Sequence, residues 1–168
     1  AEPEGASMTK TSPETKGHNE AEIVRDKWNE SLEARVKAPP RKFSWHSSTV
    51  TAFMRDTYFG GTSVSGYLAS YLDGKKVRRG LEIGGGLGMQ ARAFHQLLGT
   101  ERFDVMDIST YAVEHGNQKA QQDGLNMVYS VADLNQDTLP PDTYDLIVAS
   151  GALHHIENLE HLFEQVAT

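Results

Sequence analysis

The sequence contains no cysteine, which excludes disulfide bonds, thiolate metal ligands and a cysteine nucleophile. It has no apolar run near the ~20 residues that a membrane-spanning helix needs, and its N-terminus lacks the apolar core of a secretion signal. Positive charge is also scarce, because 23 Asp and Glu residues outweigh 16 Lys and Arg residues. Nucleic-acid phosphates are held by clustered Lys and Arg, so this balance argues against such a partner. These absences favour a cytoplasmic protein that binds neither membranes nor nucleic acids.

The length of 168 residues suits a single domain with one hydrophobic core. Residues 1–20 are rich in Pro, Gly, Ser, Thr and charge, with Met8 as the one large apolar side chain, so we expect a disordered tail. Met8 is also a candidate for the native start. We expect an N-terminal helical region over residues 21–74 and an α/β domain over residues 75–168.

Three helices are expected in the region 21–74. In the first, Ala21 to Lys37, apolar residues recur every four positions and share one face, namely Val24, Trp28, Leu32 and Val36. That face packs onto its own domain or, alternatively, forms a lid over a ligand or a dimer contact. A second helix begins at Ser47 or Ser48 and turns four apolar side chains inward, namely Val50, Phe53, Met54 and Tyr58. A third helix runs from Val64 to Leu72.

From residue 75 onward, apolar strands alternate with helices. The expected strands cover residues 77–83, 102–108, 126–133 and 144–150. The expected helices cover residues 89–98, 110–124 and 158–167. Connections between parallel strands are right-handed and place helices on both faces of the sheet. The pattern therefore predicts a three-layer α/β/α domain with a mostly parallel sheet.

A glycine-rich loop follows the first expected strand. The stretch LEIGGGLGMQ, Leu81 to Gln90, holds four glycines in five positions, namely Gly84, Gly85, Gly86 and Gly88. Glycine costs roughly 0.5–1 kcal/mol relative to alanine inside regular structure, so we interpret the cluster as a place where a ligand approaches the backbone. Ligands of open parallel sheets bind beyond the carboxyl ends of the strands, where the loop and the next helix present backbone N–H groups.

The spacing of the glycines argues against a dinucleotide. The fingerprint G-x-G-x-x-G would place its third glycine where this sequence has Met89. Gly84, Gly86 and Gly88 form G-x-G-x-G instead, with Glu82 two residues ahead. This pattern resembles the first motif of the class I, Rossmann-like S-adenosylmethionine-dependent methyltransferases. The resemblance implies that Glu82 helps to hold the amino-acid end of the cofactor and that the glycines let this end lie against the loop.

Three further matches to this family follow in order. Asp107, at the end of the second strand, matches the acid that binds both ribose hydroxyls. Asp133, at the end of the third strand, matches the acid beside the adenine. Tyr144 to Ile156 resembles the fourth motif of the family. Taken one at a time, an acid at a strand end is equally consistent with a helix cap. The resemblance adds neighbouring residues to the cofactor site, namely Gly85, Ile108, Ala132, Leu134 and Ser150.

Two adjacent histidines, His154 and His155, follow the fourth strand. Because adjacent residues at a strand exit point in different directions, they do not suit a shared metal ion, and we predict no metal site. Structural roles for both remain open, while His154 and His46 are candidate catalytic bases. Aromatic side chains in the helical region form either a pocket for the acceptor or part of the core, namely Phe43, Trp45, Phe53, Tyr58 and Phe59.

The implied reaction is transfer of the methyl group of S-adenosylmethionine to oxygen, nitrogen or carbon of a small-molecule acceptor. The cofactor supplies the electrophile, and the protein aligns donor and acceptor. The alternative is a non-catalytic cofactor-binding subunit, or a fragment of a split methyltransferase, with an interaction role.

The sequence departs from the family after its fourth strand. A complete member has a seven-stranded sheet, whereas this sequence ends at Thr168, so it resembles a family member truncated after the fourth strand. The strand at residues 144–150 would then form an exposed apolar edge. We consider a fragment, one piece of a split enzyme, or a homodimer or second chain that covers the edge.

Overall fold

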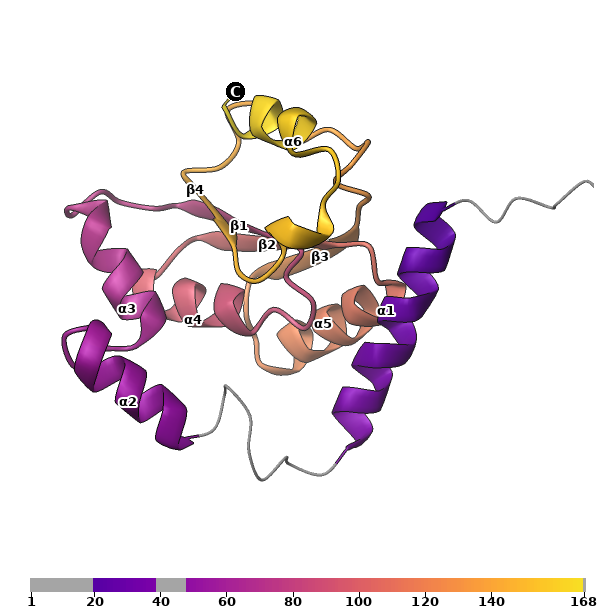
Figure 1. The fold of residues 1–168 in the computed structure, drawn as a ribbon. Coiled ribbons are helices and arrows are strands. Elements are labelled where there is room, and N and C mark those ends of the chain that lie inside the picture. The colour runs from indigo at the N-terminus through magenta and orange to yellow at the C-terminus, as the bar shows by residue number, and fades with distance from the viewer. Residues whose placement is uncertain (1–19, 39–47, 168) are drawn as a thin grey trace, which may run out of the picture.

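The computed structural model describes residues 20–38 and 48–167. They form an α/β domain with a four-stranded parallel sheet between helices, so the predicted fold class is confirmed (Figure 1). The expected tail and the candidates Phe43, Trp45 and His46 lie outside the described residues. None of the helices in the described part of the chain is long and apolar enough to cross a membrane.

The strands of the sheet lie in the order β3-β2-β1-β4. Their bounds are Arg79–Ile83 for β1, Arg102–Asp107 for β2, Met127–Val131 for β3 and Leu146–Ala149 for β4. The chain moves outward from β1 through β2 to β3 and then returns to the other side of β1. The switch point at which connections diverge therefore lies between β1 and β4, beyond the carboxyl end of β1. The observed strand is shorter than the expected strand 144–150, and the Asp145 carboxylate that precedes it accepts hydrogen bonds from the Arg78 and Arg79 N–H groups.

Helices cover both faces of the sheet (Figure 1). On one face lie α4, Met89–Leu98, and α5, Thr110–Gln122, while α6, Leu159–Val166, lies on the other. The first core, beneath α4 and α5, consists of Ala91, Phe94, Phe103, Val105, Ala120, Met127 and Tyr129. The second core, on the α6 side, consists of Leu81, Ile83, Ala132, Leu134, Leu139 and Leu162. In β4, alternate side chains enter different cores, with Leu146 and Val148 against the first and Ile147 and Ala149 against the second, as the two-residue period of a strand requires.

The N-terminal helices flank the first of these faces. They are α1, Glu20–Lys37, α2, Ser48–Tyr58, and α3, Val64–Ala69, which is followed by a 3₁₀ turn, Ser70–Leu72. Figure 1 shows α1 beside α5 and α3 beside α4.

The expected burial of the apolar faces of α1 and α2 is confirmed only in part, because Trp28, Val50 and Met54 are half-buried and Leu32 is buried, whereas the other four predicted side chains are exposed. In α1 only Leu32 is buried, while Val24 and Val36 are 38% and 43% exposed. In α2 no residue is buried, and Phe53 and Tyr58 are 58% and 59% exposed. The reason is geometric: α1 meets the domain near its middle, and α2 lies beyond α3, away from the sheet (Figure 1).

Tyr129 explains the glycine inside α5. Its ring is buried, and a Cβ atom added at Gly116 would lie 2.3 Å from the ring atoms Cδ1 and Cε1. The neighbouring Asn117 side chain accepts a hydrogen bond from the Tyr129 N–H and donates one to the Tyr129 carbonyl, both at 2.9 Å. Because β3 lies at an edge of the sheet, this amide satisfies backbone groups that no further strand pairs.

Replacement of Gly116 with alanine tests this packing. Helix propensity alone predicts that Gly116→Ala stabilises the fold by up to ~1 kcal/mol. The collision with Tyr129 predicts the opposite sign, a loss of about 1–3 kcal/mol in the free energy of unfolding measured with urea. In a Tyr129→Leu background the loss should disappear. A stabilising Gly116→Ala in the unaltered protein would contradict the packing.

Candidate functional site

The glycine loop connects β1 to α4 at the switch point of the sheet, where the sequence predicted a ligand. Gly88 precedes α4 with φ 68°, and no side chain of its own caps the helix. Glu82 supplies the missing acceptor from the strand, since its Oε2 atom accepts a hydrogen bond of 2.8 Å from the Ala91 N–H. The first N–H groups of a helix have no partner within the helix, so this buried carboxylate fixes the position of α4 relative to β1.

Burial dominates the electrostatics of Glu82, because this residue is only 2% exposed. The pKa of Glu82 is raised to about 7, chiefly by desolvation and also by the negative charge of Asp107, while the hydrogen bond from the Ala91 N–H opposes the shift. Loss of water disfavours the ionised form of a carboxyl group. Glu82 therefore titrates near neutral pH, beneath the glycine loop.

Asp107 joins the loop to the end of β2. Its Oδ2 atom accepts a hydrogen bond of 2.7 Å from the Gly86 N–H, and its Oδ1 atom accepts one of 2.8 Å from the Ser109 N–H. A carboxylate has about four lone-pair positions, so roughly one remains on each oxygen. This arrangement suits a ligand with two neighbouring hydroxyl groups.

The four loop glycines have different surroundings. A Cβ atom at Gly84 would lie 2.5 Å from the Ala152 Cβ, one at Gly85 would lie 2.6 Å from Val105 Cγ1, and one at Gly88 would lie 2.1 Å from the Tyr129 hydroxyl. A Cβ atom at Gly86 would have Leu32 Cδ2 as its nearest neighbour, at 4.0 Å. Three of the glycines therefore accommodate the protein's own side chains, and Gly86 alone leaves room for a ligand.

Asp133 organises the loop after β3. Its Oδ1 atom accepts hydrogen bonds from both nitrogens of Asn135, and its Oδ2 atom accepts one from Gln136. The Asn135 side chain in turn accepts from the N–H groups of Glu157 and Asn158, which lead into α6. Asp133 therefore stabilises the turn after β3, and its Oδ2 atom still has a lone pair that can accept from one further donor.

The remaining cofactor candidates divide into buried and exposed groups. Ala132 and Leu134 are buried in the second core, so their burial does not favour the predicted contact with a base. Ser150 is exposed after β4, and Ile108 is half-buried after Asp107. Contact of these residues with a cofactor stays a prediction.

The histidine pair lies next to the glycine loop, because Ala152, which abuts Gly84, leads directly into it. The ring centroids of His154 and His155 are 3.7 Å apart, so the expectation that these side chains diverge is wrong. The physical reason is that they lie in a 3₁₀ turn, Leu153–His155, and not on a strand. Trp28 of α1 meets His155 edge-on at 5.0 Å. Desolvation lowers the pKa of His155, and the charges of His154 and Lys27 lower it further.

Asn29 is a residue that the sequence analysis missed. Its Oδ1 atom accepts hydrogen bonds from the Ser109 hydroxyl, at 2.7 Å, and from the Tyr111 N–H, at 3.1 Å. Its Nδ2 atom donates to the Thr110 hydroxyl at 3.0 Å. The only signal in the sequence was a polar residue directly after Trp28 on a helix that we considered as a possible lid.

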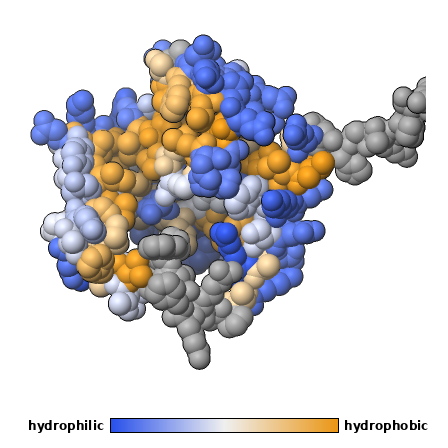
Figure 2. All heavy atoms as spheres, in the orientation of Figure 1, coloured by the Kyte–Doolittle hydropathy of each residue, from blue (hydrophilic) through white to orange (hydrophobic). Residues whose placement is uncertain are grey.

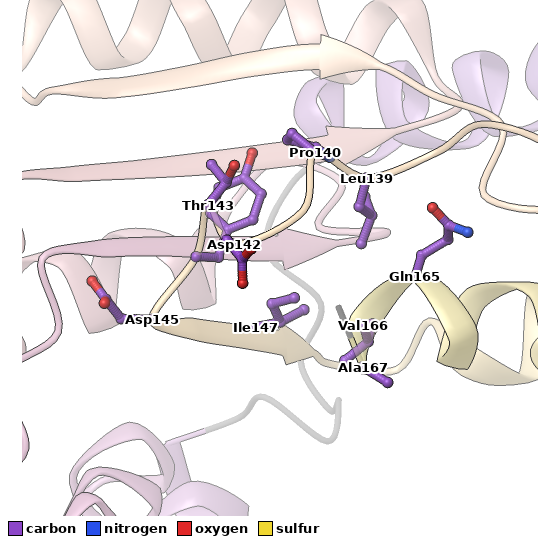
Figure 3. Close-up of a pocket in the computed structure, with 10 residues that line it drawn as sticks. Leu139, Pro140, Asp142, Thr143, Asp145, Ile147, Gln165, Val166 and Ala167 are labelled. Carbon is purple, nitrogen blue, oxygen red and sulfur yellow. The ribbon is translucent and has the colours of Figure 1, made fainter.

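A separate cavity of about 330 Å³ lies beside β4, between the segment before that strand and the end of α6. Figure 3 shows Ile147 of β4 facing Leu139 and the end of α6 across this cavity. Its lining includes Tyr144 and Val166 but none of the predicted site residues. The cavity therefore belongs to the edge of the sheet and not to the glycine loop.

Comparison with known proteins agrees with this geometry. A family model described as "Methyltransferase domain" matches residues 81–168. A hybrid PKS-NRPS synthetase from Penicillium oxalicum is 32% identical over 92 residues, which cover 51% of this chain and 2% of the synthetase. A ubiquinone/menaquinone biosynthesis C-methyltransferase from Hydrogenovibrio crunogenus is 28% identical over 89 residues, which cover 51% of this chain and 35% of the relative.

Among solved structures, a similar one is an S-adenosylmethionine-dependent methyltransferase from Mesorhizobium loti. It is 25% identical with a TM-score of 0.51, and the match covers 62% of this chain and 48% of that chain. The chain thus spans less than half of the length of each of these three proteins.

The raised pKa of Glu82 predicts a pH-dependent stability. Its usual value is 4.5, so the folded protein holds this proton more tightly than the unfolded chain does. The stabilisation is complete below the usual pKa and is lost as the pH rises through about 7. Glu82→Gln keeps an acceptor for the Ala91 N–H without the titration.

We therefore expect the free energy of unfolding of Glu82→Gln, relative to the unaltered protein, to increase by about 2–3 kcal/mol between pH 5 and pH 8. Urea unfolding across this pH range measures the difference and cancels the titration of other groups. A difference that does not vary with pH would contradict the burial of an ionisable Glu82.

Proposed function

This chain belongs to the methyltransferase domain family, and we propose that it binds S-adenosylmethionine and transfers the methyl group to a small-molecule acceptor. The observation that carries the proposal is the pairing of Asp107, which has acceptor capacity for two hydroxyls, with the open backbone at Gly86. A ribose diol beside a backbone that a side chain does not cover matches this arrangement. The ionised form of Glu82, beneath the loop, favours a positive charge such as the ammonium of an amino acid above it, and such a charge would in turn favour ionisation of Glu82.

Each of the site residues is assigned to a different part of the cofactor. We assign the ribose hydroxyls to Asp107 and the amino-acid end to the loop at Gly86, with Glu82 acting through its charge. Asp133 retains lone-pair capacity on Oδ2, which suits the single amine of an adenine. When bound, S-adenosylmethionine supplies an electrophilic methyl group on a sulfonium. The protein contributes alignment of the acceptor and exclusion of water.

The acceptor is proposed to be a small molecule that carries a nucleophilic oxygen, nitrogen or carbon. The name of the Hydrogenovibrio relative includes "C-methyltransferase", which supports testing activated carbon acceptors first. His154 remains the proposed catalytic base for an acceptor that must lose a proton, and its ring partner His155 lies within the same turn. The alternative, a cofactor-binding subunit without activity, predicts binding without turnover on any acceptor class.

Binding of S-adenosylhomocysteine tests the proposal, with Gly86→Ala as the site variant. Gly86 and Gly124 both have positive φ, 52° and 64°, and a Cβ atom at Gly124 meets nothing within 4 Å. Alanine should cost each position about 1–2 kcal/mol of stability, because both adopt the left-handed conformation. Only Gly86→Ala should weaken binding in calorimetric titration, by about tenfold or more.

Equal affinity of Gly86→Ala and Gly124→Ala would contradict the placement of the cofactor. Absence of binding by the unaltered protein would contradict the proposed function itself. Titration with NADH provides a comparison, for which we expect no binding.

We further propose that a strand from a second copy of this chain, or from a second chain, covers the edge of the sheet at β4. Within the described residues β4 pairs with β1 alone, and its four residues are Leu, Ile, Val and Ala. Figure 2 shows apolar atoms gathered between α3 and α6 over this part of the sheet. An unpaired apolar edge is a template for pairing with another strand.

Size-exclusion chromatography with light scattering measures the predicted assembly. We expect a particle of twice the chain mass of 18.6 kDa if a second copy covers β4. A well-behaved monomer at micromolar concentration would contradict covering by a second copy and leave a different chain as the proposed partner.

A further inference from the structure

A continuous run of hydrogen bonds connects α1 to the glycine loop. The Ser109 hydroxyl donates to Asn29 Oδ1, the Ser109 N–H donates to Asp107 Oδ1, and the Gly86 N–H donates to Asp107 Oδ2. All three distances lie between 2.7 and 2.8 Å. The orientation of the Asp107 carboxylate therefore depends on residues on both sides of it, one in the loop and one in the first turn after β2.

Ser109 lies at the centre of this run of hydrogen bonds, between Asn29 and Asp107. The residue is fully buried, and its hydroxyl also accepts a hydrogen bond from the Ala112 N–H, which caps α5. A hydroxyl can donate only one hydrogen bond, and the Ser109 hydroxyl donates it to Asn29 Oδ1. Without Asn29 this buried proton needs another acceptor, and the Asp107 carboxylate, already bonded to the Ser109 N–H, is a neighbouring one. Asn29 thus keeps a lone pair of Asp107 available.

The same face of α1 carries two further contacts across the site. Leu32 is the buried residue of the helix, and its Cδ2 atom lies 4.0 Å from the Cβ position of Gly86. Trp28 meets the ring of His155 on the turn after β4. The middle of α1 therefore touches the ends of three strands through three side chains, and Asn29 is the member that makes directional bonds.

We propose that Asn29 is a positioning residue of the cofactor site. Its amide clamps α1 to the first turn of α5, directs the Ser109 hydroxyl away from Asp107, and holds Leu32 above Gly86. The identity of the ligand in this inference rests on the proposed function. The hydrogen bonds themselves do not.

Three variants of α1 separate positioning from stability. Asn29→Leu is similar in size and removes all three hydrogen bonds. Asn29→Asp keeps an oxygen for Ser109 and Tyr111 and removes the amide donor to Thr110, whose hydroxyl can donate to the new oxygen instead. Glu30→Ala alters an exposed position of the same helix. Leu162→Val, in the second core, lowers stability at a site remote from the network.

The first measurement is the affinity for S-adenosylhomocysteine by calorimetry, well below the unfolding temperature of each variant. We expect Asn29→Leu to bind about tenfold more weakly and Asn29→Asp to stay within about threefold of the unaltered protein. Glu30→Ala and Leu162→Val should bind normally, because a purely structural loss does not change the site of the folded protein.

The second measurement needs no ligand. The chain has two tryptophans, so a Trp45→Phe background leaves Trp28 as the single reporter. In that background Asn29→Leu should shift the fluorescence emission of Trp28 to longer wavelength, as α1 detaches and the indole meets water. Glu30→Ala should leave the emission unchanged.

The outcomes distinguish this inference from the proposed function. If the unaltered protein binds no S-adenosylhomocysteine, the proposed function fails and the assignment to a cofactor site fails with it. If the unaltered protein binds and Asn29→Leu binds equally well, only the positioning role is overturned, whatever the emission of Trp28 shows. Weaker binding by Asn29→Leu, restored in Asn29→Asp, together with the emission shift, supports it.

Discussion

The hydrogen bond from the Gly86 N–H to the Asp107 carboxylate holds the glycine loop in place. It joins the connection after β1 to the end of β2, and the parallel register of the two strands brings these ends together. Glu82 adds a second attachment by accepting from the first turn of α4. Carboxylates from adjacent strands thus hold the middle of the loop, at Gly86, and the first turn of the helix that follows it, at Ala91. A ligand that binds there meets a backbone already arranged, which lowers the entropic cost of binding.

The rest of the domain extends from this arrangement in both directions. Tyr129 of β3 packs beneath Gly88 and Gly116 and so sets how closely α4 and α5 approach the sheet. On the other face, Asp133 orders Asn135, which binds the segment leading into α6. The acids at the ends of β2 and β3 therefore serve the fold even without a ligand. The helix-cap and cofactor interpretations of these acids are compatible, because a carboxylate has lone pairs for both.

The N-terminal region relates to the site through few contacts. About half of the apolar residues of α1 and α2 remain exposed, and Leu32 is the one buried residue of α1. The attachment of α1 consequently combines the burial of Leu32 with the hydrogen bonds of Asn29. Such an attachment is specific in direction and modest in energy, since a hydrogen bond contributes roughly 1 kcal/mol net.

The sequence by itself determined the alternation of strands and helices, and with it the parallel sheet, the switch point and the positions of Glu82, Asp107 and Asp133 at strand ends. These follow from local periodicity and from the general rules of strand connection. Only the tertiary structure decided why the individual glycines are needed, since the Tyr129 ring approaches Gly88 from a strand about forty residues away. It also decided the role of Asn29 and the meeting of His154 with His155. Partners distant along the chain leave no periodic signal, and side-chain directions depend on turns that local pattern does not specify.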